Sequence, residues 1–389
     1  MVPLLAPRFA LVALLALALS TCAPAAPAAR PAEPAAPGSA PTAAPAPRPA
    51  AKPALGPDYF AGKVVTVLVN YSAGGISDVF GRTVARHLAN HIPGRPTLVV
   101  ENRPGAGGAV GANYLYNVAK KDGLTIGTFS AFLVRQMLGT EGTQYDVSRF
   151  HWLGGVGEPN FDIAHQSLGV RSAQDLARTS SEVVVGGLAP DSPSDMHMRT
   201  FLNLLGVRYR YVTGYPGFPE VRLAFQRGEV NYRADGLTGW FTYLAPQVQE
   251  GTVVPIAQVG TIRGSQVVRD PRISDLPTHF EIAAELRGPD VRSTVEYRAL
   301  TVLAQMGALL RGVLLPPGTD PAIVETLRKA VADTFADAEF HADIEKQAGY
   351  RVEFIPGEEA QALAERIIRD ASTDREAMDY LIKLTKEKD

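Results

Sequence analysis

Two segments of the chain share one order of features: a β-branched run, a loop that contains glycine, and a helix-like pattern. The run at 64–69 (VVTVLV) suits a strand that is buried on both faces. After it, residues 76–92 place apolar side chains at a spacing of four, which is typical of an amphipathic helix. The order repeats with a strand at 98–100, glycines within 105–108 and a helix through 110–118. Because alternating strands and helices build parallel sheets, this order predicts an α/β fold.

The rest of the chain continues this alternation. The segment 316–335 combines prolines, an aspartate that can cap a helix, and apolar residues at a spacing of four, so a helix is expected there. The chain is expected to be helical again from Gly357. Further strands are predicted at 124–129, 182–186, 209–212, 253–259 and 312–315.

Each of the two glycine loops opens a helix, and each is a candidate cradle for an anion. The first loop is 71–78 (YSAGGISD) and the second is 102–108 (NRPGAGG). Glycines let backbone N–H groups approach a ligand closely, and a helix N-terminus carries about half a positive charge. In an open parallel sheet both loops lie at the carboxyl ends of strands, where ligands bind. The alternative is that either loop is only a tight turn.

The composition allows two ordinary domains and excludes some classes of partner. The chain has 389 residues, of which 46% are hydrophobic, so each domain can have a sizeable core. Its 38 basic residues nearly balance its 40 acidic ones, so no strong field attracts nucleic acid or an anionic membrane surface. A single cysteine excludes an intramolecular disulfide framework and a Cys-rich metal cluster.

The first 22 residues are predicted to be a signal peptide. One positive charge at Arg8 precedes an apolar run at 9–19, which is too short to span a bilayer stably. The run ends in LSTC (19–22), which resembles a bacterial lipobox, where the cysteine carries a lipid after cleavage; Thr21 departs from the small residues preferred there. Cys22 is therefore the predicted lipidation site. A conventional cleavage site among the following alanines is the alternative.

Residues 23–57 are nearly all alanine and proline, a composition that cannot bury enough apolar surface to fold. We expect a disordered linker that tethers the folded part to its anchor. The folded part is expected to begin near Asp58. No later stretch is long and apolar enough to predict a membrane span.

Five motifs then follow in a fixed order along the folded part. YSAGGISD (71–78) and VVENRPGAGGAVGAN (99–113) are followed by GYPG (214–217), by RGEV (227–230) with Asp235, and by LPPGT (315–319). This ordered set resembles the solute-binding receptors of tripartite tricarboxylate transporters, the Bug or TctC-like family. The resemblance covers about residues 62–385, which is nearly the whole folded part.

The resemblance implies a type II periplasmic-binding-protein fold, in which two α/β lobes enclose a ligand cleft. The first lobe would comprise residues 58–157 plus 262–389 and the second residues 158–261. Ligands of the family are typically carboxylates, held largely by backbone amides and bridging waters. The same resemblance implies no catalytic residue, no metal and no cofactor.

The family's binding positions map onto loops of both lobes. In the first lobe they are Ser72, Gly74, Gly75, Asp78, Gly105, Gly107, Gly108 and Ser130. In the second lobe they are Ser192, Ser194, Asp195, Tyr215, Gly217 and Asp235, with Arg233 added by the argument that follows.

Three departures from the family pattern affect the expected site. Ser72-Ala73 replaces the family's Ala-Pro, which removes the fixed φ of proline from the first loop. Arg233 lies two residues from Asp235 on a predicted strand, so the two share a face, and we hypothesise that Arg233 pairs with a distal anionic group of the ligand. The alternative is a surface arginine paired with Glu229. The loop 191–195 is acidic for an anion site, so an amino acid is a second expected ligand class.

These observations predict a monomeric periplasmic solute-binding protein, tethered through Cys22, that closes on a small carboxylate or amino acid and delivers it to a membrane permease. A sensory binding protein that feeds a receptor is one alternative, and a hydrolase on the same fold is another.

Dinucleotide binding is disfavoured because the spacing of 105–111 does not match G-x-G-x-x-G. His87 and His91 have the spacing of a metal pair without an accompanying glutamate, so a solvated helix end is the preferred interpretation; His197 has no nucleophile to activate.

Overall fold

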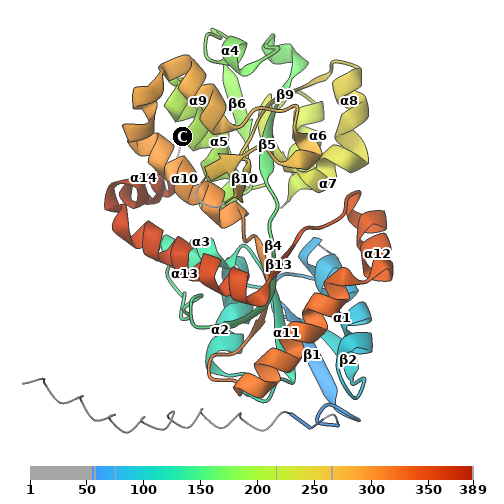
Figure 1. The fold of residues 1–389 in the computed structure, drawn as a ribbon. Coiled ribbons are helices and arrows are strands. Elements are labelled where there is room, and N and C mark those ends of the chain that lie inside the picture. Colours follow the sequence, from blue (N-terminus) through green and yellow to red (C-terminus); the bar gives the residue numbers. More distant parts are fainter. Residues whose placement is uncertain (1–54, 57, 75, 216, 264–265, 388–389) are drawn as a thin grey trace, which may run out of the picture. The chain divides into compact units, whose positions relative to one another are not determined.

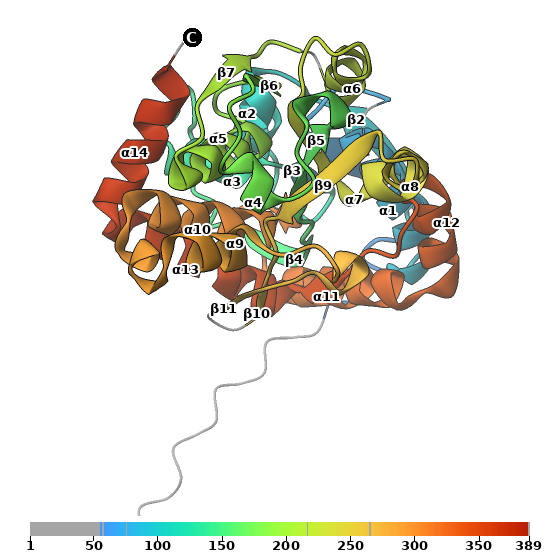
Figure 2. The same cartoon turned by 90° about the horizontal axis from the view of Figure 1, so that it is seen from above.

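Two large sheets organise the chain, and helices cover both (Figures 1 and 2). The computed structural model describes residues 55–56, 58–74, 76–215, 217–263 and 266–387. The predicted signal peptide with Cys22, nearly all of the predicted linker, and Gly75 lie outside the described residues. Among the described helices, none is both long and apolar enough to cross a bilayer.

The first sheet contains six strands in the order β13-β4-β12-β3-β1-β2. The strands are β1 (Val64–Val69), β2 (Thr97–Asn102), β3 (Thr125–Ser130), β4 (His151–Val156), β12 (Arg311–Leu315) and β13 (Phe354–Pro356). Its helices are α1 (Ile76–His91), α2 (Ala109–Asn117), α3 (Phe132–Met137), α11 (Pro321–Ala336), α12 (Ala338–Ala348) and α13 (Gly357–Thr373). The predicted strands at 64–69, 98–100, 124–129 and 312–315 and the predicted helices are confirmed, with boundaries within a few residues.

Successive side chains of the first sheet pack into opposite apolar layers. Leu153 and Val313 join the core beneath α1 and α11, whereas Trp152 and Leu314 join the core beneath α2, α3 and α13. Each large apolar side chain that is fully buried in this way stabilises the fold by about 1.5–3 kcal/mol. The alternation follows from the period of two along a strand.

The second sheet contains five strands in the order β7-β6-β8-β5-β9. The strands are β5 (Asn160–His165), β6 (Val183–Gly186), β7 (Tyr209–Val212), β8 (Tyr232–Gly236) and β9 (Val253–Gln258). Its helices include α4 (Ala173–Leu176), α5 (Pro193–Leu205), α6 (Phe218–Gln226), α7 (Leu237–Gly239) and α8 (Ala245–Gln249), with a π-helical turn at Trp240–Leu244 between the last two. A hairpin of β10 (Thr261–Arg263) and β11 (Gln266–Val268) follows β9.

The parallel arrangement predicted for the strands at 64–69 and 98–100 is confirmed, but each sheet also contains antiparallel pairs. Strands β1, β2 and β3 are parallel, but β12 runs antiparallel to β3 and β4. In the second sheet β6, β7 and β8 are parallel, but β5 runs antiparallel to β8 and β9. The chain enters the second sheet at β5 and returns to the first sheet at β12. Neither strand is reached through a helix from a strand of the same sheet, so the rule that makes neighbouring strands parallel does not apply to them.

Helices α9 (His279–Arg287) and α10 (Val295–Gly307) pack with the second sheet. Helix α9 contacts α5 and β9, and α10 lies along α5, with Phe280 and Leu300 in that sheet's core. The sequence assigned residues 262–389 to the first lobe, but these contacts place 279–307 on the second sheet, and the chain joins the first sheet again only at β12. A helix's apolar stripe shows that it packs on a sheet without showing which one.

The C-terminal helices link the two sheets. Helix α13 packs on β4 of the first sheet, and α14 (Arg375–Lys386) packs on α5 and α10. The guanidinium of Arg199 in α5 donates to the carbonyl of Leu384 at 2.8 Å, and Asn203 donates to the Tyr380 hydroxyl at 2.8 Å. The end of the chain therefore holds the second sheet's helices as well as the first sheet.

Candidate functional site

The two glycine loops lie side by side at the carboxyl edge of the first sheet. Because β1, β2 and β3 are parallel neighbours, the loops that follow them share one edge. The Tyr71 hydroxyl donates to the carbonyl of Gly107 at 3.2 Å, and the Asn102 amide donates to the carbonyl of Tyr71 at 2.9 Å. Ser72, Gly74, Gly105 and Gly107 are exposed, so this edge is open to solvent.

Two glycines of the second loop have conformations and surroundings that exclude a side chain. Gly107 and Gly108 have φ angles of 58° and 91°, which L residues rarely adopt. A β-carbon on Gly107 would lie 2.5 Å from Nη1 of Arg135, and one on Gly108 would lie 2.4 Å from Nδ2 of Asn70. The backbone of this loop is therefore packed directly against two polar side chains.

Asp78 organises the first loop through its carboxylate. Its Oδ2 accepts from the Gly74 N–H at 2.9 Å and from Nε of Arg82 at 2.8 Å, and its Oδ1 accepts from Asn102 at 2.9 Å. Burial opposes ionisation, but these bonds outweigh it and lower the pKa of Asp78. The side chain is buried, so both of its oxygens hold loops in place.

Ser130 joins the ends of β1 and β3. Its N–H donates to Oδ1 of Asn70 at 3.1 Å, its carbonyl accepts from Nδ2 of Asn70 at 3.0 Å, and its hydroxyl accepts from Ser77 at 3.0 Å. The sequence reasoning missed Asn70, although an amide directly after a buried strand and before a glycine loop was a usable signal.

Asp195 plays the corresponding role in the second sheet. Ser192 caps α5, and the hydroxyls of Ser192 and Ser194 donate to Oδ1 of Asp195 at 2.7 and 3.0 Å. The Tyr211 hydroxyl donates to Oδ2 at 2.6 Å. Burial raises the pKa of Asp195, although these hydrogen bonds act in the opposite direction. Ser192, Ser194 and Asp195 thus form one bonded group at the start of α5.

Arg233 and Asp235 share a face of β8, as predicted, and pair with each other at 2.5 Å. Asp235 also accepts from the Tyr243 hydroxyl and from the Gly236 N–H, the latter at 2.9 Å, and burial together with the Asp235 charge raises the pKa of Tyr243 to about 12. Arg233 is 1% exposed and lies 5.0 Å from the Phe225 ring. The alternative of a surface arginine paired with Glu229 is wrong, because Glu229 pairs with Arg227.

Tyr215 and Gly217 flank the start of α6. Tyr215 is half-buried and packs against the apolar core, and burial raises the pKa of its hydroxyl. Gly217 precedes the helix in an extended conformation that any residue can adopt. These two positions show nothing that requires a ligand, so their binding role stays a prediction.

Arg135 connects the glycine loops to the loop before α5. It lies on α3, beside Gly107, and its Nη1 is 3.4 Å from Oδ2 of Asp191 in the loop before α5. The side chain is 13% exposed, and its buried Nε has no hydrogen-bond partner in the described part of the chain. Nothing in the spacing of the sequence singled out Arg135, because its relation to Gly107 and Asp191 arises only from the fold.

The two histidines considered for a metal have carboxylate partners. His87 and His91 each contact a carboxylate at 3.1 Å, from Asp343 and Asp337 respectively. The expected solvated helix end is thus wrong for His87, which is buried against α12. His197 is also buried. No cluster of metal-ligating side chains occurs within the described ranges.

Comparison with known proteins gives one relative in sequence and several in structure. No family model matches the chain. A curated relative from Cupriavidus necator, described as "UPF0065 protein in gbd 5'region", is 26% identical over 285 residues, which are 70% of this chain and 75% of the relative.

The structural relatives are periplasmic binding proteins. A TctC solute binding protein from Polaromonas matches with a TM-score of 0.61 at 20% identity over 82% of this chain and 98% of that one. The periplasmic binding protein BugD matches with a TM-score of 0.56 at 22% identity over 81% and 97%. MatC from Rhodopseudomonas palustris, solved with bound malate, matches with a TM-score of 0.56 at 20% identity over 81% and 99%. The resemblance drawn from the glycine motifs is confirmed at the level of the fold: the chain has the two-lobed α/β fold of Bug and TctC proteins.

Proposed function

We propose that this chain is an extracytoplasmic solute-binding protein of the Bug and TctC type, which captures a small carboxylate between its lobes without chemical change and delivers it to a membrane permease. The observation that carries the proposal is the pair of adjacent glycine loops with the Arg135 guanidinium beside Gly107. Backbone amides at helix N-termini and a guanidinium both favour an anionic group. The malate bound to MatC, which has the same fold, supports a carboxylate as the ligand.

The state of the acidic residues favours a carboxylate over an amino acid. Asp78, Asp195 and Asp235 each have their carboxylate oxygens bonded to donors of the protein itself. Such a carboxylate repels an incoming anion less strongly than an unbonded carboxylate does. It is also no longer available to pair with a ligand's ammonium group. The amino-acid ligand suggested by the acidic loop 191–195 is therefore the second choice.

Lobe closure is the proposed means of capture. We assign residues 158–307 to the second lobe, since α9 and α10 pack on its sheet. Arg135 already contacts Asp191 across the two lobes, so a ligand carboxylate that binds Arg135 would meet both lobes at once. A ligand that makes more contacts in the closed form shifts the population toward it.

Export and anchoring complete the proposal. The signal-like segment and Cys22 support a periplasmic protein held to a membrane by a lipid. In cells, Cys22→Ser is expected to release the protein from the membrane fraction, while unchanged fractionation would argue against the anchor.

Calorimetric titration of the purified protein with malate and related dicarboxylates tests the binding function. Gly107→Ala would displace Arg135 and is expected to weaken the binding of the best ligand roughly tenfold or more. Gly142→Ala is the matched control, because Gly142 also has a positive φ of 81° but has open space around its α-carbon. Equal affinity in both variants, or no carboxylate binding by the unmodified protein, would overturn the proposal.

A further inference from the structure

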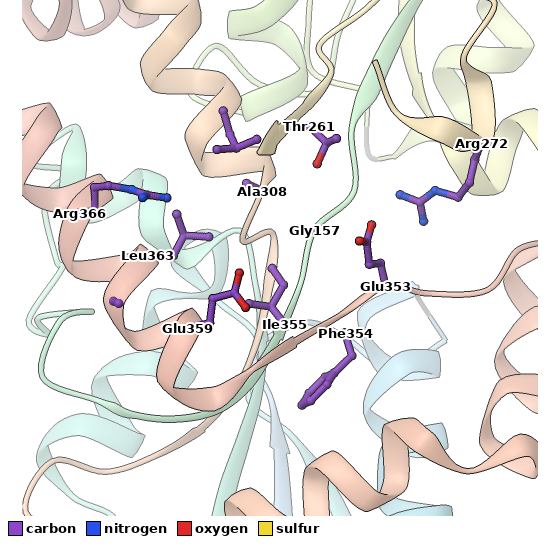
Figure 3. A pocket seen from close by; sticks show the side chains of 12 residues that line it. Gly157, Thr261, Arg272, Ala308, Glu353, Phe354, Ile355, Glu359, Leu363 and Arg366 are labelled. Atoms are coloured by element: carbon purple, nitrogen blue, oxygen red, sulfur yellow. The ribbon is translucent and has the colours of Figure 1, made fainter. Parts of the chain in front are cut away.

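A cavity lies where the chain passes between the two sheets (Figure 3). Its volume is about 310 Å³, which is at the small end of the range for metabolite pockets. Its lining combines residues of the crossing segments with one face of α13. None of the glycine-loop residues or second-sheet loop residues assigned above to the carboxylate site lines it.

Two crossings and the hairpin strand β10 contribute to this cavity. Gly157 lies between β4 and β5, Thr261 and Ile262 lie just after β9, and Ala308 lies between α10 and β12. The crossings touch: the Glu158 N–H donates to the carbonyl of Gly307 at 3.1 Å, and a β-carbon on Gly157 would lie 2.6 Å from the carbonyl oxygen of Ala308. Any relative movement of the two lobes must therefore change the walls of this cavity.

The α13 wall carries two charged side chains of opposite sign. Glu359 and Arg366 are seven residues apart, so they lie on one helix face about 10 Å from each other along the axis. Neither forms an ion pair or a side-chain hydrogen bond with another described residue. Figure 3 shows both projecting from α13, with Arg272 and Glu353 on the opposite side.

The floor between the two charges is apolar. Leu363 lies between Glu359 and Arg366 on the same face of α13, and Ile262 and Ala308 line the same cavity. A ligand that fits this arrangement has a carboxylate for Arg366, an ammonium group for Glu359 and a short hydrocarbon portion between them.

We propose that this hinge cavity is a second ligand site, which binds a small zwitterion whose ammonium and carboxylate groups are separated by a short hydrocarbon chain, such as an ω-amino acid. Its chemistry differs from that of the glycine-loop edge, where the carboxylate of Asp78 is already bonded to the protein. Because its walls belong to the crossings, binding there couples to lobe position; this coupling, unlike the site itself, rests on the proposed function.

The test is titration of the purified protein with a matched set of probes: 5-aminopentanoate, leucine, pentanoate and pentylamine. We expect 5-aminopentanoate to bind, and the other three probes to bind roughly tenfold more weakly or worse. Pentanoate and pentylamine each lack one charge, and leucine carries both charges on one carbon. Glu359→Gln and Arg366→Gln are each expected to weaken zwitterion binding by a similar factor. Glu365→Gln and Arg369→Gln, on the part of α13 that does not line the cavity, are the controls and should leave it unchanged.

The Gly107→Ala variant separates this proposal from the binding function proposed above. Zwitterion binding that persists in Gly107→Ala and is lost in Arg366→Gln supports the hinge site. The proposal is overturned if zwitterion binding is lost in Gly107→Ala, if pentanoate binds as tightly as the zwitterion, or if neither α13 substitution weakens the binding. It is also overturned if no zwitterion binds at millimolar concentration. None of these outcomes bears on whether dicarboxylates bind at the glycine loops.

Discussion

The loops at the carboxyl edges of the two sheets are held in place in different ways. In the first lobe, the second glycine loop has no side chain at Gly107 and Gly108, so its backbone is packed against Asn70 and Arg135. In the second lobe, the loop before α5 is held by a buried carboxylate that collects hydroxyl donors from Ser192, Ser194 and Tyr211. The first arrangement offers main-chain atoms to a ligand, and the second uses its side chains to fix a helix start.

This difference explains how an acidic loop is compatible with the proposed anion site. Asp195 is almost fully buried, and its charge is shared among three hydroxyl groups. Asp191, which is more exposed, pairs instead with Arg135 across the lobes. The acidic residues therefore differ in role, although they occur within five positions of the sequence.

The largest effect is expected from removing the carboxylate that holds the second-lobe loop. Asp195→Ala leaves buried hydroxyls without their acceptor, so the free energy of unfolding should fall by about 3 kcal/mol. Asp191→Ala, in the same loop but exposed, should cost only about 0.5 kcal/mol. Urea denaturation monitored by circular dichroism measures both. Equal stability of the two variants would contradict the internal role of Asp195.

A smaller loss of stability is expected in acid, and it arises from a residue of the second lobe. Burial lowers the pKa of His197 on α5 to about 3, with His279 of α9 nearby and Glu158 lining the same small cavity. The unfolded chain takes up this proton below pH 6.5, whereas the folded protein does not, so stability is full above that pH and falls as the pH decreases toward 3. At pH 5 the loss from this residue is about 2 kcal/mol.

His197→Phe should remove that part of the acid sensitivity. The variant and the unmodified protein are compared by urea denaturation at pH 7.5 and pH 5, and the difference between the two pH values should be about 2 kcal/mol smaller in the variant. Parallel losses in both proteins would show that His197 does not carry the acid sensitivity of the second lobe.

Much of this fold was predictable from local patterns, and the parts that were not depend on long-range pairing. The strand at 64–69, the helix after it and the glycine loops have periodic or compositional signals. The antiparallel direction of β5 and β12 has no such signal, because direction within a sheet depends on how the chain returns from the other lobe. For the same reason the contacts of α9 and α10 with α5 and β9 could not be read from the sequence.

The loops of the candidate site could be predicted from the sequence, but what their individual residues do could be predicted less well. Both glycine loops were expected at the carboxyl ends of parallel strands, and the structure adds that Tyr71 and Gly107 are adjacent there. The sequence did not show that Asp78 and Asp195 are bonded to protein donors, since the partners Asn102 and Tyr211 come from other strands. Arg135 was missed because a single arginine on a short helix has no pattern.

An intermediate effect is expected from the side chain that joins the two lobes' loops. Arg135→Gln removes a guanidinium beside Gly107, so the affinity for the best carboxylate should fall about tenfold, which corresponds to about 1.4 kcal/mol. Arg149→Gln, an exposed arginine of the same lobe, is the control. Calorimetric titration measures both variants. If Arg135→Gln binds as tightly as the control, the first-lobe site uses main-chain atoms alone and the contrast between the lobes becomes sharper.

The smallest effect is expected from Asp78, the carboxylate that organises a loop of the first lobe. Asp78→Asn replaces an acceptor of three donors by an amide that cannot serve Arg82 and Asn102 equally well, so unfolding at pH 7 should become easier by about 1 kcal/mol. The pKa of Asp78 is lowered in the folded protein, so its contribution is present above the pKa of the unfolded chain and is lost as the pH falls through the folded value. Urea denaturation at pH 7 and pH 3 should therefore show the two proteins converging in acid. If the difference in unfolding free energy is the same at both pH values, Asp78 acts through its shape and not its charge. The way in which Asp78 holds its loop would then resemble that of Asp195 less than the hydrogen bonds suggest.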